Sequence, residues 1–305
     1  MLLLQASPSP FAGAGELCAV GNLLAWGTAS VLFRRAFRTH RPADATLFKN
    51  VVSLAVLAAL AVALGPARGG GASGAGDWSW LLVSGALAVG VGDFLYFVAL
   101  VHIGVARTQV LVLSAPVLTA LLAVPILGER MTALQWTGAF LVVGAGVLVE
   151  SRRSQRVRAD TLGVLAALGA VLAYASGTLA THWGLDDTGA FTASAWRLAG
   201  GVVAVLLLQA ANGRLLPAAA ALLRRDNWRA FLLPTLIGTV VGMGLLSASL
   251  KWTRQGVAMG IGGALPLVSI PLARWWLGER PGLRGWGGAA LAGVGVALLA
   301  SAAAG

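Results

Sequence analysis

The chain of 305 residues is 58% hydrophobic and only 11% charged, and its formal net charge is +11. A soluble domain is closer to a quarter charged, and one soluble core could not bury this much apolar surface, so a soluble globular protein is excluded. The single cysteine excludes an internal disulfide. The three scattered histidines, without metal-ligand spacing, give no reason to expect a metal or another cofactor.

The apolar residues fall into runs of about 20, each long enough to cross about 30 Å of hydrocarbon as a helix. Because a backbone in lipid must satisfy its own hydrogen bonds, and the short alternating segments of a closed barrel are absent, we expect an all-α integral membrane protein. The links are short, except for a Gly-rich one after the second helix and residues 212–227 after the seventh. In chain order, ten transmembrane helices are predicted at residues 14–34, 44–64, 78–99, 104–127, 132–150, 161–183, 190–211, 228–250, 255–277 and 282–302.

An internal repeat divides the chain near its midpoint. At a shift of 150 residues, the LGER motif at 127–130 matches LGER at 277–280, and nearer the N-terminus the best shift is 148. Each repeat therefore has five helices, in residues 14–150 and 161–302, and the basic loop 151–160 joins them. Since five is odd, the repeats must be inverted relative to each other, an arrangement typical of secondary transporters that bind substrate between the repeats.

The distribution of charge predicts the orientation. Sixteen arginines fall on one side of the predicted membrane and only four basic residues on the other. By the positive-inside rule, this places the basic loops in the cytoplasm and both termini outside, in a cell (inner or plasma) membrane. The charges are spread over five short loops, which argues against nucleic acid as a partner. The basic side comprises Arg34, Arg35, Arg38, Arg41, Arg107, Arg152, Arg153, Arg156, Arg158, Arg214, Arg224, Arg225, Arg229, Arg274, Arg280 and Arg284.

Several features recur in the two repeats or stand out beside the LGER motif. They are the helix-one aromatics Trp26 and Tyr174, the basic residues Lys49 and Arg197, the stretch GDFLYFVALVHIGVART, and the mid-helix prolines Pro116 and Pro266. On these features the chain resembles the ten-helix EamA branch of the drug/metabolite transporter (DMT) superfamily over nearly its whole length. The resemblance implies a central cavity formed mainly by the first four helices of each repeat, with the fifth and tenth helices outside. It also implies transport, usually export, of small metabolites, amino acids or lipophilic compounds. Family members are often drawn with both termini inside, and the charge count here indicates the opposite.

The LGER motif has two interpretations. Its glycine ends a helix, and its glutamate then precedes the next helix, whose N-terminal dipole favours a carboxylate. The structural interpretation is a helix-hairpin corner, placed once on each face of the membrane by the inverted repeat. The functional interpretation is a gate charge at the rim of the cavity. The two copies comprise Gly128, Glu129 and Arg130, and Gly278, Glu279 and Arg280.

Charges inside a bilayer are costly and therefore mark candidate functional residues. Lys49 and Arg197 occupy matching positions in the second helix of each repeat, where they could hold an anionic substrate group, snorkel or neutralise a backbone break. Asp93 has no acidic counterpart, because the matching residue is Met243. It could bind a proton or a cationic substrate, or pair permanently with Lys49 or Arg107. If no cation is close, desolvation would raise its pKa toward neutral pH and allow proton coupling.

Aromatic residues supply the expected walls of a binding cavity. Trp26 and Tyr174 lie mid-helix, Trp196 adjoins Arg197, and Tyr96 lies one turn beyond Asp93. Such walls suit amphipathic or aromatic metabolites and allow cation–π contacts, and ordinary core packing is the alternative.

We therefore expect a secondary active transporter, an exporter of small metabolites such as amino acids or amphipathic and aromatic compounds. Its partners would be a small-molecule substrate and the lipid bilayer. The sequence contains no P-loop, so nothing in it indicates that ATP drives transport. It also lacks the clustered carboxylates or histidine ligands that an integral membrane enzyme would need. A channel or scaffold without a transport cycle is the remaining alternative. A stripe of small residues suits close packing within a monomer or in a homodimer: Gly285, Ala289, Gly293, Ala297 and Ser301.

Overall fold

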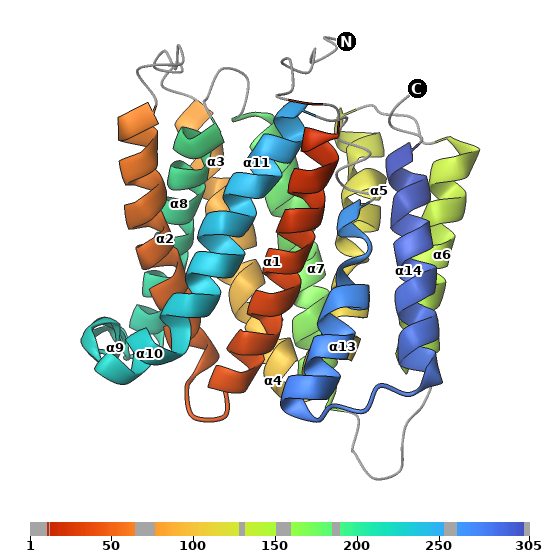
Figure 1. The fold of residues 1–305 in the computed structure, drawn as a ribbon. Helices are drawn as coiled ribbons and strands as arrows, with labels where there is room; N and C mark the ends of the chain where they lie inside the picture. Colours follow the sequence, from red (N-terminus) through yellow and green to blue (C-terminus); the bar gives the residue numbers. More distant parts are fainter. Residues whose placement is uncertain are drawn as a thin grey trace.

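The structure of the chain, a computed structural model, describes residues 11, 13–64, 77–127, 132–150, 160–184, 190–252 and 261–301, and these residues contain helices but no strand. The first repeat comprises α1 (Ala14–Ala36), α2 (Pro42–Leu64), α3 (Asp77–Ser84), the π-helical segment η2 (Gly85–Gly92), α4 (Asp93–Val112), α5 (Ala115–Leu127) and α6 (Ala133–Glu150). The second comprises α7 (Thr161–His182), α8 (Ala190–Ala211), α9 (Leu215–Leu223), α10 (Arg225–Pro234), the π-helical segment η3 (Thr235–Val241), α11 (Gly242–Trp252), α13 (Leu265–Leu277) and α14 (Leu283–Ser301). Figure 1 shows them as a bundle of mostly upright helices.

The described helices agree with the all-α inverted-repeat prediction. Six helical stretches are long and apolar enough to span, and one of them, Trp78–Val112, contains 35 residues. That stretch would be about 52 Å long as a straight helix, well beyond the hydrocarbon thickness. Gly104 breaks it, with φ 77 and ψ 174, so the third crossing ends there and the fourth begins at Val105. The predicted division between 78–99 and 104–127 therefore corresponds to a turn inside α4.

The two repeats share irregularities in their helices that helix propensities did not predict. The π-helical segments η2 and η3 begin 150 residues apart, at Gly85 and Thr235, which is the shift of the sequence repeat. The geometry shared by the two repeats extends to two prolines, which were expected in mid-helix. Pro116 and Pro266 instead lie in the first turns of α5 and α13, after breaks at Leu113 and Ala264. A proline lacks the N–H that a first turn leaves unused, which explains this placement.

The link predicted at 212–227 contains a helix that the sequence reading missed. α9 is a short apolar helix, and Arg224, with φ −69 and ψ 124, separates it from α10. Figure 1 shows α9 and α10 at the lower end of the bundle, beside the lower end of α2. The signal was the nine-residue apolar run LLPAAAALL between arginines, which is too short to span a membrane but long enough to lie on its surface.

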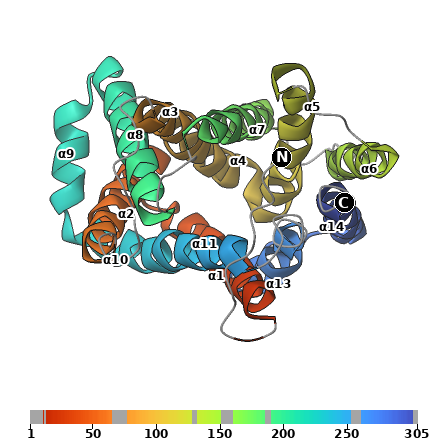
Figure 2. The same cartoon turned by 90° about the horizontal axis from the view of Figure 1, so that it is seen from above.

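The fifth helix of each repeat lies outside the main bundle. Figure 2 shows α6 and α14 side by side at one edge, away from α2 and α8. Small and branched residues of both helices form one buried cluster with Val110 and Ile270, and Ala289 of the predicted small-residue stripe is fully buried in it. Ala289 therefore serves packing within the chain, whereas Ala297 of the same stripe is exposed.

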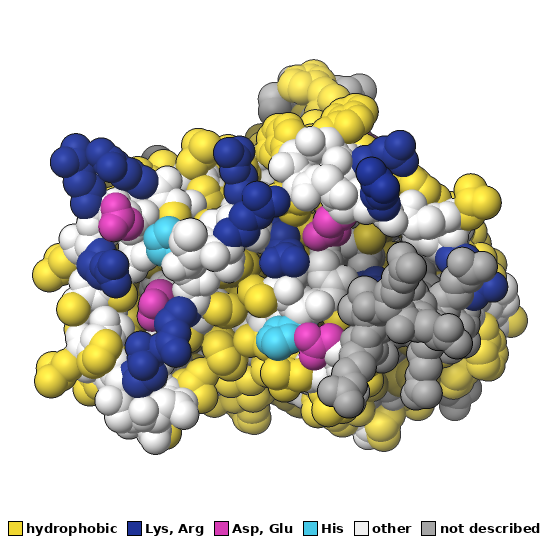
Figure 3. Space-filling model, turned by 90° about the horizontal axis from the view of Figure 1, so that it is seen from below, with side chains coloured by type: hydrophobic (Ala, Val, Ile, Leu, Met, Phe, Trp, Pro, Cys, Tyr) yellow, Lys and Arg dark blue, Asp and Glu magenta, His cyan; other side chains and the backbone are white. Residues whose placement is uncertain are grey.

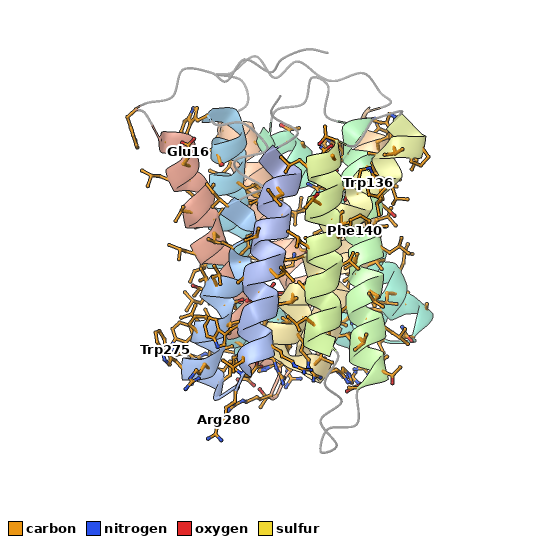
Figure 4. The ribbon with its side chains drawn as sticks, turned by 90° about the vertical axis from the view of Figure 1, so that its right-hand side faces the viewer. Glu16, Trp136, Phe140, Trp275 and Arg280 are labelled. Carbon is orange, nitrogen blue, oxygen red and sulfur yellow. The ribbon has the colours of Figure 1, made fainter. Side chains whose placement is uncertain are left out.

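Basic side chains gather at one end of the bundle, which we call the basic end. Figure 3 views this end and shows several groups of Lys and Arg side chains around a few acidic ones. Figure 4 shows Trp275 and Arg280 at the basic end and Glu16 and Trp136 at the opposite end. Four arginines of loop 151–160, namely Arg152, Arg153, Arg156 and Arg158, lie outside the described residues.

Candidate functional site

The first and central contact is a buried ion pair between two helices of the first repeat. Lys49 lies about two turns into α2, and Asp93 is the first residue of α4 after η2. The Lys49 Nζ is 2.8 Å from Asp93 Oδ2, and the two side chains are only 1% and 10% exposed. A cation is therefore close to Asp93, and of the two ion-pair partners that the sequence left open, Lys49 is the one in contact with it.

Asn50, which the sequence analysis did not single out, connects this ion pair to the π-helical segment. The Lys49 ammonium donates to Asn50 Oδ1 at 2.7 Å, and Asn50 Nδ2 donates to the Val89 carbonyl at 3.1 Å. Val89 lies inside η2, where the wider helix rearranges the carbonyls. The amide therefore satisfies a buried carbonyl and orients the ammonium. The available signal was the polar Lys-Asn pair in an otherwise apolar helix.

The second repeat contributes the other partner of Asp93. The Tyr174 hydroxyl, on α7, donates to Asp93 Oδ1 at 2.6 Å, so both carboxylate oxygens are engaged. The ring can come this close because residue 92 is glycine: a Cβ added to Gly92 would lie 2.9 Å from Tyr174 Cε1. Asp93 thus joins a lysine of one repeat to a tyrosine of the other.

A second polar pair lies one turn beyond Asp93. Gln109 Nε2 donates to the Tyr96 hydroxyl at 3.0 Å, and both side chains are buried. The pair links the third crossing to the fourth below the carboxylate. Tyr96 was predicted as a substrate contact, and in this structure its hydroxyl is engaged by Gln109 and Ser30.

Arg197 is the second-repeat counterpart of Lys49, and its environment differs. It lies in α8 at the point of closest approach to η2, where a Cβ on Gly85 would lie 1.8 Å from the Arg197 carbonyl oxygen. Its guanidinium interacts electrostatically with Asp93, and its Nε is buried without a hydrogen-bond partner among the described residues. A buried donor without a partner is costly, so this position is suited to an anionic group.

The remaining predicted aromatics separate into two environments. Trp26, in α1, is half-buried, and a Cβ on Gly242 would lie 3.1 Å from its Cδ1. Trp196 is 40% exposed and packs against Trp78 in a tilted arrangement, with ring centroids 5.6 Å apart. Trp78 stands at the start of α3, so the structure places Trp196 at the edge of the bundle near the end opposite the basic one, outside the Asp93 cluster.

The LGER corner of the second repeat makes a contact that the sequence analysis did not foresee. Gly278 ends α13 in the left-handed conformation, with φ 71. Glu279 was expected to face the N-terminus of the helix that follows it. Its carboxylate instead accepts the Val105 N–H, at 3.2 Å and 3.0 Å to its two oxygens, and so caps the fourth crossing in the other repeat. We call this contact the inter-repeat cap.

Two neighbours complete the inter-repeat cap. Gly104 gives the carboxylate room, because a Cβ there would lie 2.9 Å from Glu279 Oε1. Arg34 Nε, at the end of α1, is 3.7 Å from the same oxygen. The carboxylate thus ties the repeats together at the basic end and does more than form a local corner. The other copy of the motif, Gly128, Glu129 and Arg130, lies outside the described residues.

An all-helical inverted repeat with buried ions at the junction of its halves defines a polytopic membrane transporter. Comparison with known proteins gives the family. The model of the EamA-like transporter family matches residues 13–150 and 161–301, and the chain belongs to this family.

Relatives and a solved structure agree with this assignment. The chain is 28% identical over 282 residues to a Streptantibioticus cattleyicolor protein named "Probable terminal-alkyne amino-acid exporter", covering 91% of this chain and 90% of that protein. It is 36% identical over 105 residues to an "Uncharacterized transporter in cobO 3'region" of Sinorhizobium sp, covering 34% of this chain and 74% of that one. A solved crystal structure shares the fold over 94% of this chain and 96% of its own, with a TM-score of 0.63 at 18% identity.

Proposed function

We propose that this membrane transporter exports a small zwitterionic metabolite of the amino-acid class by alternating access. The observation that carries the proposal is the Lys49–Asp93 ion pair, buried where the two repeats meet and bridged by Tyr174. A substrate with both an ammonium and a carboxylate can exchange partners with such a pair without leaving a buried charge alone. The relative named as an amino-acid exporter supports the same substrate class.

In the proposed complex, the substrate ammonium lies against Asp93 and its carboxylate against Lys49 and Arg197. The buried Arg197 Nε, which lacks a partner among the described residues, would gain one. Tyr174, Tyr96 and Trp26 would form the walls for the substrate side chain. Trp196 would act at the mouth of the site and not in it, since it is exposed and its ring packs against Trp78.

Proton coupling at Asp93 follows from the same exchange. When Lys49 turns to a substrate carboxylate, or when the repeats move apart, Asp93 loses its cation in a buried setting. A carboxylate in that position favours a proton or the substrate ammonium, because an unpaired buried charge is expensive. We propose that Asp93 takes up a proton after substrate release and that this proton is exchanged for the next substrate molecule.

The decisive experiment uses the full chain in proteoliposomes, with a panel of radiolabelled amino acids and with or without a pH gradient. We expect Asp93→Asn to abolish gradient-driven uphill transport while substrate-for-substrate exchange persists. Glu16→Gln, at the opposite end, is the matched acidic control and should keep gradient-driven transport. If Asp93→Asn retains full gradient-driven transport, Asp93 is structural and uniport or another coupling site replaces the proposal.

We further propose that the basic end faces the cytoplasm, as the positive-inside rule predicts. Cys18 is the sole cysteine, so a Cys18→Ser background allows single-cysteine labelling. Thr39→Cys at the basic end and Ala133→Cys at the opposite end are both exposed positions. An impermeant thiol reagent added to intact cells should label position 133 and spare position 39, and the reverse pattern would invert the orientation.

A further inference from the structure

The surface helix α9 has an exposed apolar face. Leu216 and Leu223 are 81% and 86% exposed, whereas Ala218 and Ala221 are buried against the bundle. The helix lies at the basic end, with arginines immediately before and after it. A short helix with exposed leucines and flanking arginines lies in the boundary between lipid headgroups and acyl chains. The surroundings of α9 are therefore at headgroup level.

A cationic cavity of about 720 Å³ opens between α9, α10 and the turn that joins α1 to α2. We call it the arginine cavity. Two aspartates, Asp44 and Asp226, offset part of its charge, but the positive charges outnumber them two to one. Figure 3 shows Lys and Arg side chains surrounding acidic ones on this face. Its arginines are Arg41, Arg214, Arg224 and Arg229.

A second cavity, of about 750 Å³, adjoins the first and is mainly apolar. We call it the lateral groove. It is lined by α4 and the start of α2 from the first repeat, and by α7 and α8 from the second. Leu165, on its rim, is 60% exposed. The lateral groove shares three residues with the arginine cavity, and these are Arg41, Asp44 and Arg214.

We propose that these two connected cavities bind one anionic phospholipid from the leaflet at the basic end. The phosphate lies between Arg41 and Arg214, at the point the cavities share, and the arginine cavity accommodates a charged headgroup. An acyl chain follows the lateral groove past Val98 and Leu165. Charge complementarity selects an anionic lipid over a zwitterionic one, because the excess of arginines is available to more than one negative charge.

The position gives the lipid a structural consequence. The lateral groove is lined by helices of both repeats, so a lipid within it contacts both sides of the junction that must move during alternating access. The bound lipid therefore stabilises the conformation in which this groove is open. This goes beyond the substrate site, which lies at Asp93 and contains neither Arg41 nor Arg214.

The test measures lipid binding to the purified full chain by native mass spectrometry in detergent. Phosphatidylglycerol and phosphatidylcholine of equal chain length are titrated separately. We expect tighter binding of phosphatidylglycerol, and roughly tenfold weaker binding of it in the double variant Arg41→Gln/Arg214→Gln, with phosphatidylcholine unchanged. Arg38→Gln is the matched control, an exposed arginine of the same end that lines neither cavity. An equal loss in Arg38→Gln would overturn the site.

A second arm separates a lipid from a soluble anion. Leu165→Trp obstructs the lateral groove at an exposed position and leaves every arginine in place, so the chain should fold, as thermal unfolding will verify. We expect it to weaken phosphatidylglycerol binding and to abolish the thermal stabilisation that this lipid gives the wild type. Inorganic phosphate should not compete at equal concentration. If phosphate competes equally and Leu165→Trp has no effect, the cavity binds a soluble anion and the lipid proposal fails.

Discussion

The junctions of the two repeats have the same scaffold but different chemistry. In each, an aromatic residue of one repeat packs on the glycine at the end of the other repeat's π-helical segment: Tyr174 on Gly92, the last residue of η2, and Trp26 on Gly242, directly after η3. The next residue is Asp93 in the first repeat and Met243 in the second. The π-helical segments and glycines therefore form the duplicated framework, whereas the carboxylate and its hydrogen bond to tyrosine occur in the first repeat.

The basic residues show the same contrast. Lys49 has an ion-pair partner at 2.8 Å, whereas the Nε of Arg197 is buried without a hydrogen-bond partner among the described residues. One cation is committed to a carboxylate and the other retains donor capacity. If the two repeats were identical, Lys49 and Arg197 would have the same environment. The difference between their environments is therefore what can give rise to substrate recognition. Substitutions at matched positions can test this difference directly.

The largest expected effect is the loss of the ammonium beside Asp93. Lys49→Met leaves a buried carboxylate without its cation, and breaking such a pair typically costs about 3–5 kcal/mol. Arg197→Met, at the matching position, should cost less, because it removes no ion pair among the described residues. Thermal unfolding in detergent measures both. Recovery in the double variant Lys49→Met/Asp93→Leu would confirm the cause, and equal losses in the two single variants would refute the asymmetry.

The next largest effect is expected at the two glycines that contact the aromatic rings, Gly92 and Gly242. Gly92→Ala places a Cβ 2.9 Å from the Tyr174 ring and pulls its hydroxyl away from Asp93, whereas Gly242→Ala places one 3.1 Å from Trp26. Overpacking alone costs about 1–3 kcal/mol. We expect Gly92→Ala at the upper end of that range with impaired substrate exchange, and Gly242→Ala at the lower end with exchange retained. Melting temperatures and substrate-exchange assays on the same preparations compare the two variants. A larger loss of stability or exchange in Gly242→Ala would contradict the placement of the substrate site at Gly92 and Asp93.

The same particulars show what the sequence could predict. Runs of apolar residues and the 150-residue repeat were sufficient for the ten crossings and the inversion, because both depend on local composition. They could not identify the partner of Asp93, for which Lys49 and Arg107 were both possible, because that choice depends on how α2 packs on η2. They also missed α9, whose apolar run is shorter than a span. The Glu279–Val105 contact joins residues 174 positions apart, and no local pattern announces it.

Removing the inter-repeat cap should have a moderate effect. Glu279→Ala leaves the Val105 N–H without its acceptor, and loss of a helix cap costs about 0.5–2 kcal/mol. Glu279→Gln keeps an oxygen acceptor and is the matched control, with a smaller loss. Hydrogen–deuterium exchange should show faster exchange of the segment containing the Val105 amide in Glu279→Ala. Unchanged exchange there would mean that the carboxylate does not hold the repeats together.

The smallest expected effect concerns a second contact between the repeats at the basic end. Asp160 caps α7 through the Gly163 N–H at 3.4 Å and pairs with His102 of α4. The hydrogen bond from His102 lowers the pKa of the Asp160 carboxyl below its ordinary value of 3.8, followed by the cap bond from Gly163. A carboxyl with a lowered pKa stabilises the folded state above its ordinary pKa, and this contribution is lost as the pH falls through the lower folded value.

Asp160→Asn should therefore reduce the melting temperature slightly at pH 7, because the ionised carboxylate is lost. The difference from the wild type should shrink as the pH falls below the ordinary value of 3.8 and through the lower pKa of the folded state, where the wild-type carboxyl is itself becoming protonated. The effect stays small because the side chain is 34% exposed and solvent screens the pair. Glu16→Gln at the opposite end serves as the control for general acid destabilisation. A difference that persists or grows at low pH would show that Asp160 acts through packing and not through its charge.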